Sequence, residues 1–166
     1  MKVDNNLDWI TLCPEQFRDK LRQNIRCRPE YPATTAFKED KQAAQSWGKY
    51  AEALTARYLL TRGLPIREMN WKPGKGKGEI DIITQRDNRI IFVEVKARTG
   101  RRTDPWEAIT PAKIRDLCHG ADIYLKMQRE RYEYQFDVAL LWGSYDDFEF
   151  EYLEDAFLCP LKQSGR

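Results

Sequence analysis

The segment from Gly78 to Lys96 constrains the fold more than any other part of the chain, because it reads as two apolar strands joined by a short polar turn. Its first half is Gly-Glu-Ile-Asp-Ile-Ile, and its second half is Ile-Ile-Phe-Val-Glu-Val-Lys. An ordinary hairpin buries one hydrophobic face and covers the other with mixed polar residues. Here the polar positions are Glu79, Asp81, Glu94 and Lys96. Carboxylates gathered in this way attract a hard cation such as Mg2+.

The turn between the two strands sets their register. Asp87 and Asn88 mark it, because both residue types tolerate left-handed or turn conformations. Antiparallel pairing about this turn predicts three facing pairs: Ile82 with Val93, Asp81 with Glu94, and Glu79 with Lys96. Directly opposed residues have Cβ atoms about 4.5–5.5 Å apart, so the two facing carboxylates are close enough to share one ion. A slip of one residue would separate them, so this expectation depends on the register.

The distribution of charge favours a polyanionic partner. The 166-residue chain fits one domain and carries a formal net charge of only +2. Residues 62–131 contain 16 Lys/Arg and 10 Asp/Glu, whereas residues 132–166 contain 2 and 8. The basic part therefore surrounds the acidic hairpin, which suits a nucleic acid. A solvated surface followed by an acidic end is the simpler alternative.

Cysteine usage indicates the compartment. Cys13, Cys27, Cys118 and Cys159 show no metal-finger spacing, and the sequence contains neither a signal peptide nor a long apolar run. We therefore expect reduced thiols in a cytoplasmic protein that does not enter a membrane. His119 is the only histidine, so a multi-histidine zinc site is excluded.

The rest of the chain predicts an appendage followed by an α/β domain. In residues 1–45, Phe17, Leu21 and Ile25 form the stripe of a short helix, and a proline-containing linker follows over 26–35. This helix could dock on the domain or on a protein partner. In the domain, one helix is expected from near residue 40 or 46 to residue 62, and a second begins at Pro111 with Thr110 as its cap. Further strands are expected at 66–70, 134–142 and 147–153.

Two basic loops and one helical lysine are candidate nucleic-acid contacts. The loop over 72–77 contains Lys72, Lys75 and Lys77, and the segment after the hairpin contains Arg98, Arg101 and Arg102. The first loop lacks the Gly-Lys-Ser/Thr ending of a P-loop, so a mobile loop without a partner is an equal alternative. Lys113 lies in the first turn of a helix, where the dipole does not favour a cation. It is therefore either a substrate contact or an ordinary surface lysine.

The order helix–strand–strand–strand–helix–strand–strand, with the spacing of Asp81 and Glu94-Val95-Lys96, resembles the PD-(D/E)XK nuclease superfamily. Further segments narrow the likeness to the YraN-type family of predicted endonucleases, which is similar to archaeal Holliday-junction resolvases. These segments are Gly48-Lys-Tyr-Ala-Glu52, Asn70-Trp71, Gly78-Glu-Ile-Asp-Ile-Ile83, Phe92-Val-Glu-Val-Lys-Ala-Arg98, Ala108 to Lys113, Phe136-Asp-Val138 and Ala156-Phe157. The resemblance covers about residues 46–158. It implies a restriction-endonuclease-like core with a mixed central sheet flanked by helices, between the appendage and a tail over 159–166.

The resemblance also implies roles for four residues. Asp81 and Glu94 would bind Mg2+ or Mn2+, Lys96 would be the superfamily lysine, and Glu52 would be the helix acid that completes the site. The surroundings of Glu52 in the sequence, taken alone, favour a solvated helix glutamate. Three departures stand out: Ile80 precedes Asp81 where the superfamily has proline, Gln135 stands where an arginine is common, and the loop over 72–77 is longer than usual.

Three hypotheses follow. The first is a Mg2+-dependent endonuclease that hydrolyses phosphodiester bonds in branched or junction DNA, for which two sites in a homodimer would be favourable. The second is a catalytically silent nucleic-acid-binding module with a nuclease fold and a protein partner on its N-terminal helix. The third is a purely structural hairpin in which Glu79 and Lys96 form a surface ion pair worth about 0–1 kcal/mol.

Overall fold

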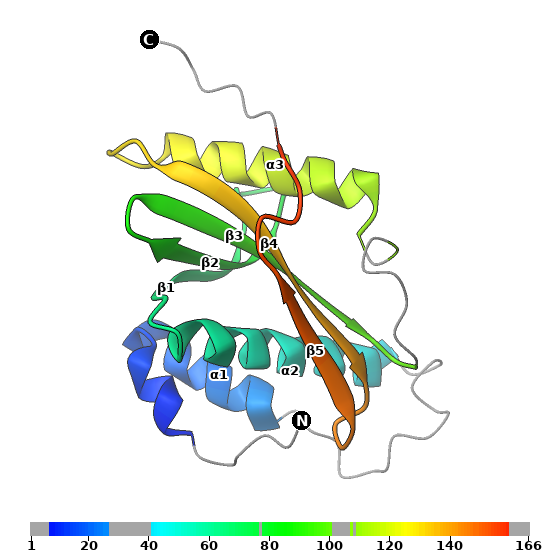
Figure 1. Ribbon diagram of the computed structural model, residues 1–166. Helices are drawn as coiled ribbons and strands as arrows, with labels where there is room; N and C mark the ends of the chain where they lie inside the picture. The colour runs from blue at the N-terminus through cyan, green and yellow to red at the C-terminus, as the bar shows by residue number, and fades with distance from the viewer. Residues whose placement is uncertain (1–6, 27–40, 77, 101–106, 108, 160–166) are drawn as a thin grey trace.

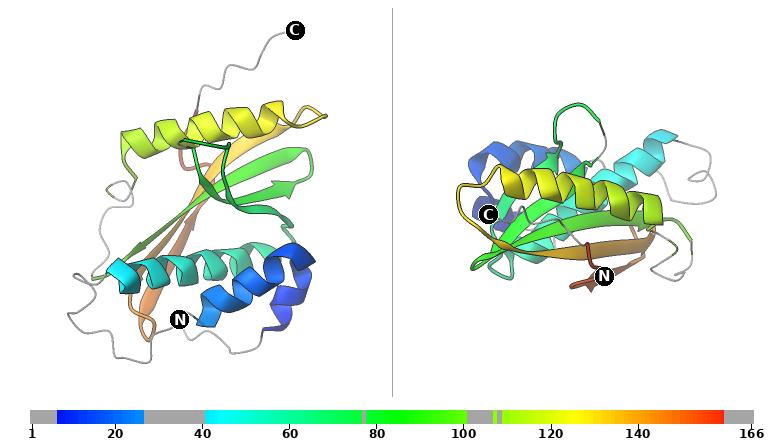
Figure 2. Two further views of the ribbon diagram at one scale, coloured as in Figure 1. Left: turned by 180° about the vertical axis from the view of Figure 1, so that it is seen from behind. Right: turned by 90° about the horizontal axis from the view of Figure 1, so that it is seen from above.

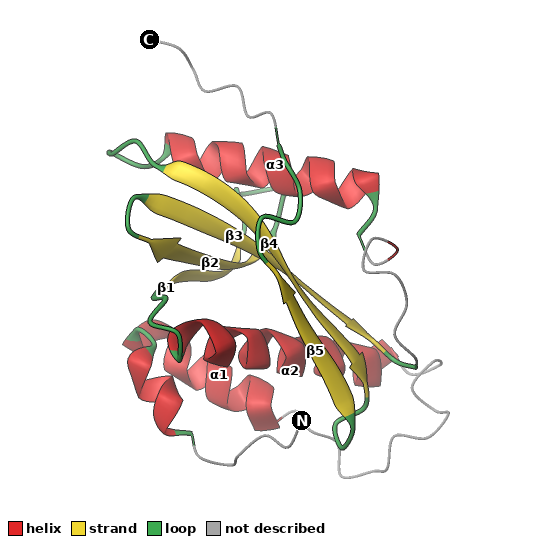
Figure 3. Cartoon of the chain, viewed as in Figure 1, coloured by secondary structure: helices red, strands yellow, loops and turns green. Residues whose placement is uncertain are grey.

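The structure is a computed structural model that describes residues 7–26, 41–76, 78–100, 107 and 109–159. A short 3-10 helix, η1 (Asp8–Leu12), precedes three α-helices: α1 (Glu15–Arg26), α2 (Lys41–Leu60) and α3 (Pro111–Lys126). The five strands are β1 (Ile66–Trp71), β2 (Ile80–Arg86), β3 (Arg89–Arg98), β4 (Glu133–Gly143) and β5 (Phe148–Leu153) (Figure 3). The predicted α/β order is therefore confirmed, with α1 preceding it.

The strands form one mixed sheet in the order β1-β2-β3-β4-β5. Neighbouring strands are antiparallel except β3 and β4, which are parallel. A parallel pair needs a crossover, and α3 lies in the connection between these two strands (Figure 1). The half of β3 that carries Glu94 and Lys96 is therefore the half that precedes α3 in the chain.

Helices cover both faces of the sheet. Figures 1 and 2 show α1 and α2 on one side and α3 on the other. The core beneath α2 contains Trp47 and Leu54 together with Val93 of β3, whereas the core beneath α3 contains Leu117 and Phe92. Alternate residues of β3 thus belong to different cores, as the period of a strand requires.

The N-terminal helices share the core of the domain. Ile10 of η1 and Leu21 of α1 are fully buried in the same cluster as Leu59 of α2. Of the two docking alternatives for this segment, the structure shows contact with the domain. The proline-containing linker lies largely outside the described residues.

Two glycines let α3 approach the start of the acidic strand. A Cβ at Gly120 in α3 would clash with the carbonyl oxygen of Gly78, and Gly78 itself has φ +111. Gly78 therefore requires glycine for its backbone conformation, and Gly120 requires it because a side chain would not fit. As predicted, Thr110 caps α3 by accepting a hydrogen bond from the Lys113 N–H at 3.1 Å.

The cysteine prediction was wrong for one pair. Cys118 in α3 and Cys159 after β5 form a disulfide, with their Cα atoms 5.7 Å apart. The two residues are far apart in the sequence, so no short spacing could indicate the bond. Cys13 is a buried free thiol, and Cys27 lies outside the described residues. In the part of the chain that the structure describes, no helix combines the length and the apolar character that crossing a bilayer requires.

Candidate functional site

The predicted register of the hairpin is confirmed up to the first acidic residue. Ile82 pairs with Val93, and the turn holds Asp87 at φ 51. Beyond this pair, the start of β2 pairs with β1. At this point the side chain of Asp81 makes a hydrogen bond to the backbone of β3. Its Oδ2 accepts this bond from the Val95 N–H at 2.8 Å. Asp81 is therefore tied to the strand that carries Glu94.

The predicted pairing of Glu79 with Lys96 was wrong. The described ladder between β2 and β3 ends at Ile82 and Val93, and Glu79 precedes β2. Glu79 instead lies 3.3 Å from the Nζ of Lys72, and both side chains are substantially exposed. Lys96 pairs with Glu94, the acid two residues before it on the same face of β3. The purely structural hypothesis thus loses the ion pair on which it was based.

Glu94 is the most enclosed acid of the hairpin, with a relative exposure of 2 %. Its Oε1 lies 2.7 Å from the Nζ of Lys96, and its Oε2 lies 3.3 Å from the Nζ of Lys113. Oε2 is buried and accepts no hydrogen bond from the described residues. The side chains of the two lysines remain 24 % and 27 % exposed, respectively. The buried carboxylate of Glu94 therefore contacts two ammonium groups, one from β3 and one from α3, and both lie partly at the surface.

The ionised form of Asp81 is unfavourable in the folded protein. Burial raises its pKa well above the usual range, and the nearby carboxylates of Glu94 and Glu52 raise it further. The hydrogen bond from Val95 and the charge of Lys113 act in the opposite direction. A half-buried acid with like charges nearby is a frequent feature of functional sites, because this environment favours a proton or a bound cation.

Glu52 on α2 is the third acid of this region. Its Oε2 accepts a hydrogen bond from the Nδ2 of Asn70 at 3.0 Å, and Asn70 has a left-handed φ of 48 at the end of β1. Burial raises the pKa of Glu52, whereas Asn70 and the charge of Lys20 lower it. The reading of Glu52 as a merely solvated helix residue is therefore wrong: its carboxylate is held in place by a second element.

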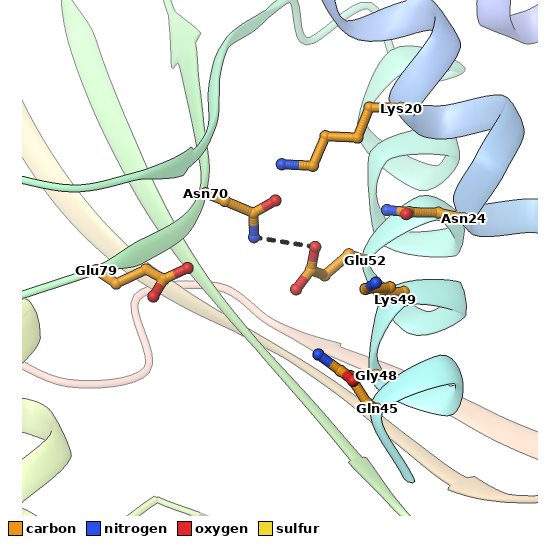
Figure 4. A pocket seen from close by; sticks show the side chains of 8 residues that line it. All are labelled: Lys20, Asn24, Gln45, Gly48, Lys49, Glu52, Asn70 and Glu79. Carbon is orange, nitrogen blue, oxygen red and sulfur yellow. Dashed lines mark hydrogen bonds between the residues drawn. The ribbon is translucent and has the colours of Figure 1, made fainter. Parts of the chain in front are cut away.

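A polar pocket of about 550 Å³ opens beside Glu52. Glu79 and Asn70 line the side formed by the strands, and Lys49 lies on the side formed by α2. Lys20 of α1 reaches into the same space, as Figure 4 shows. The pocket thus combines carboxylates, amides and ammonium groups from four segments of the chain.

The structure brings only some of the proposed basic contacts to the acids. Lys113, for which an ordinary surface position was one alternative, contacts Glu94 directly. Lys72, Lys75 and Arg98 are exposed, and Lys77, Arg101 and Arg102 lie outside the described residues. Trp71, which precedes the first of the two basic loops, packs edge-on against Tyr124 with ring centroids 5.2 Å apart.

Sequence reasoning missed four residues around Glu52. Asn70 belongs to a matched segment, but nothing in the sequence indicated that it holds Glu52. Lys20, Asn24 and Lys49 line the pocket, and two of them come from the N-terminal helix. The polar face of an amphipathic helix looks the same whether it borders solvent or a pocket, so the sequence carries no signal for these three.

The arrangement can bind a hard cation and an anion side by side. Among the described residues, no group of three or more His, Cys, Asp or Glu side chains is arranged as a complete metal site. Two neighbouring carboxylates are nevertheless enough for Mg2+, which keeps several waters and is completed by substrate oxygens. The lysines at the rim suit a phosphate group.

Comparisons with known proteins place the chain in a family. The model of the uncharacterised protein family UPF0102 matches residues 51–141, which include every acid described above. A UPF0102 protein of Phocaeicola vulgatus is 36 % identical over 116 residues, covering 69 % of this chain and 94 % of the relative. A UPF0102 protein of Syntrophomonas wolfei is 40 % identical over 94 residues, covering 55 % of this chain and 80 % of the relative. This chain therefore belongs to the UPF0102 family.

Proposed function

We propose that this protein is a divalent-metal-dependent endonuclease that hydrolyses phosphodiester bonds in DNA, with a preference for branched structures. One observation carries the proposal: Asp81 and Glu94 interact in a partly enclosed site while Lys96 and Lys113 reach it from solvent. The resemblance of these positions to the PD-(D/E)XK nuclease motif supports the same reading.

The donor set fits Mg2+ or Mn2+. Asp81 and Glu94 offer hard carboxylate oxygens, and Glu94 Oε2 is buried without a hydrogen-bond partner among the described residues. Repulsion from Glu94 and Glu52 raises the pKa of Asp81, and a divalent cation would relieve that repulsion. Asp81 and Glu94 would hold the ion, and Glu52 is the candidate third ligand. When bound, the ion would offset developing charge on the phosphate and lower the pKa of a coordinated water.

The residues of the chain itself supply the remaining chemistry. Lys96 Nζ is held by Glu94 and stays partly exposed, so it can position the attacking water or stabilise the oxyanion of the pentavalent phosphate. Lys113 presents a second ammonium from the first turn of α3. Asn70 orients the Glu52 carboxylate through its amide. Exposed Lys72, Lys75 and Arg98 would contact flanking phosphates, which gives salt-sensitive binding with little sequence preference.

A catalytically silent DNA-binding module is the second candidate. Two lysines already accompany Glu94, and the described residues contain no complete cluster of three metal ligands. Such a site could recognise phosphates without a metal. This candidate predicts binding of branched DNA and no cleavage with any divalent ion.

A cleavage assay separates the two candidates. Purified full-length protein is incubated with labelled four-way and linear DNA in Mg2+, Mn2+ or chelator. We expect metal-dependent cutting that Asp81→Asn abolishes and Lys96→Ala strongly reduces. Lys126→Ala is the matched control, because this lysine of α3 is exposed and pairs only locally with Asp122. Equal cutting by wild type and both site variants would overturn the proposed enzyme.

A further inference from the structure

The pocket beside Glu52 has a wall that the family match does not include. The matched region begins at residue 51, whereas Lys20 and Asn24 belong to α1 (Glu15–Arg26). The volume of about 550 Å³ lies within the range of known ligand sites, about 300–1,000 Å³. The N-terminal segment therefore contributes to a potential binding site and is more than packing for α2.

Asn24 is the strongest sign that this pocket receives a ligand. Its relative exposure is 5 %, and its Nδ2 donates no hydrogen bond to any described residue. A buried amide donor without a partner is costly, so native structures seldom retain one without a reason. An acceptor oxygen brought by a ligand would satisfy it.

The other groups in the pocket indicate what kind of ligand fits. Figure 4 shows Lys20 reaching from α1 towards Asn70 and Glu52. Lys49 adds a second ammonium from α2. None of the described lining residues carries an aromatic side chain, so the pocket offers no surface on which a base could stack. Cations and amide donors without aromatic rings suit phosphate and sugar oxygens.

We propose that this pocket binds the sugar–phosphate backbone of a DNA strand that enters the acidic site, with Lys20 and Asn24 of α1 as the contacts. The inference rests on the proposed function, because it assigns the substrate of the same site. It also gives the N-terminal segment a role: it extends the strand-binding surface past the region shared with the family. In this arrangement Glu52 lies between the pocket that binds the DNA backbone and the Asp81–Glu94 pair.

Equilibrium binding of labelled branched DNA tests this assignment without requiring cleavage. Full-length wild type, Lys20→Ala, Asn24→Leu and Arg22→Ala are compared in Ca2+ and in chelator over a series of salt concentrations. Arg22→Ala is the matched control, because it removes one positive charge from the same helix outside the pocket, where Arg22 pairs with Asp19 at 2.9 Å. Thermal melting of each variant reports its folding.

We expect Lys20→Ala to weaken DNA binding about 10-fold, as for loss of a charged hydrogen bond. It should also reduce the slope of log affinity against log salt by about 1. Asn24→Leu should weaken binding several-fold without lowering Tm, because it removes a donor that has no partner in the free protein. Arg22→Ala should change affinity less than about twofold.

The outcomes separate this inference from the proposed function. If wild type cuts DNA but Lys20→Ala and Asn24→Leu bind it like Arg22→Ala, the pocket assignment is wrong and the enzyme stands. If wild type never cuts but binds with the expected dependence on Lys20, the enzyme is wrong and the assignment stands. Absence of DNA binding by wild type overturns both. Displacement of DNA by inorganic phosphate at constant ionic strength would mean that the pocket takes free phosphate, which also overturns the assignment.

Discussion

Two buried carboxylates on neighbouring strands have opposite surroundings. Asp137 on β4 and Glu94 on β3 both have a relative exposure of 2 %. Asp137 accepts hydrogen bonds from the Gln135 amide at 2.7 Å, the Tyr152 hydroxyl at 2.7 Å and the Asp155 N–H at 2.9 Å. Among the described residues, the ion pairs of Glu94 are with Lys96 and Lys113, and its Oε2 accepts no hydrogen bond.

The difference separates a structural acid from a candidate functional one. A buried polar group whose partners are all neutral and fixed rigidifies the fold, and Asp137 is of this kind. Glu94 is instead paired with two partly exposed ammonium groups, which a bound metal could displace and a phosphate could recruit. Burial alone therefore does not identify the site. The number and type of partners do.

The largest expected effect is on cleavage. Lys96→Ala should lower the rate roughly 100- to 1,000-fold, as for loss of a group that stabilises developing charge. Asp137→Asn should leave the rate within about threefold, because its amide oxygen can still accept two of the three hydrogen bonds. Single-turnover cleavage well below Tm measures both variants. Similar losses in the two would remove the distinction between the acids.

The second effect is on stability. Asp137→Ala should lower the free energy of unfolding by about 3 kcal/mol, because three buried donors lose their acceptor. Urea unfolding measures the change, and Asp137→Asn serves as the conservative control. A loss below about 1 kcal/mol would show that water or a neighbour replaces the carboxylate, and that Asp137 does not organise β4.

Metal should stabilise one acid site and not the other. At a free Mg2+ concentration about 100 times its Kd, wild type should gain about 2.7 kcal/mol, because the ion binds only the folded state. Asp81→Asn should show little gain, while Asp137→Asn should respond like wild type. Melting curves over a Mg2+ titration at constant ionic strength measure the shifts. A gain that survives in Asp81→Asn would place the ion elsewhere.

The smallest expected effect is a higher Tm of the Asp81→Asn variant in the absence of metal. The pKa of Asp81 is raised by burial and by Glu94 and Glu52, so the folded protein binds more protons than the unfolded chain above pH about 3.9. Stability from this group is therefore present at low pH and is lost as pH rises through the folded pKa. Asp81→Asn should raise Tm by a few degrees at pH 7.5 and not at pH 3.5. A lower Tm at pH 7.5 would mean that the charged form is favoured in the fold.

Local patterns predicted the secondary structure well. Alternation and turn residues gave the hairpin with the correct pairing of Ile82 and Val93, and Thr110 was correctly identified as a cap. The described ladder between β2 and β3 ends at Ile82 and Val93, so the count no longer held at Glu79, which precedes β2. Register arguments extend a ladder by counting, and they cannot detect where two strands part.

Sequence patterns did not predict the contacts between distant segments of the chain. The partners of Glu94 include Lys113 from α3, whose place depends on the close approach of Gly120 to Gly78. The disulfide of Cys118 with Cys159 depends on the path of the chain after β5. Propensity and periodicity describe single elements, so tertiary contacts of this kind leave no local trace.

The most direct test of the central claim is anomalous diffraction from crystals soaked in Mn2+. The account predicts a single strong peak bonded to oxygens of Asp81 and Glu94, at about the 2.0–2.2 Å expected of a small hard cation. It also predicts no peak at Asp137. Saturating Mn2+ without a peak between the two strands, and with both ammonium groups still bound to Glu94, would contradict it.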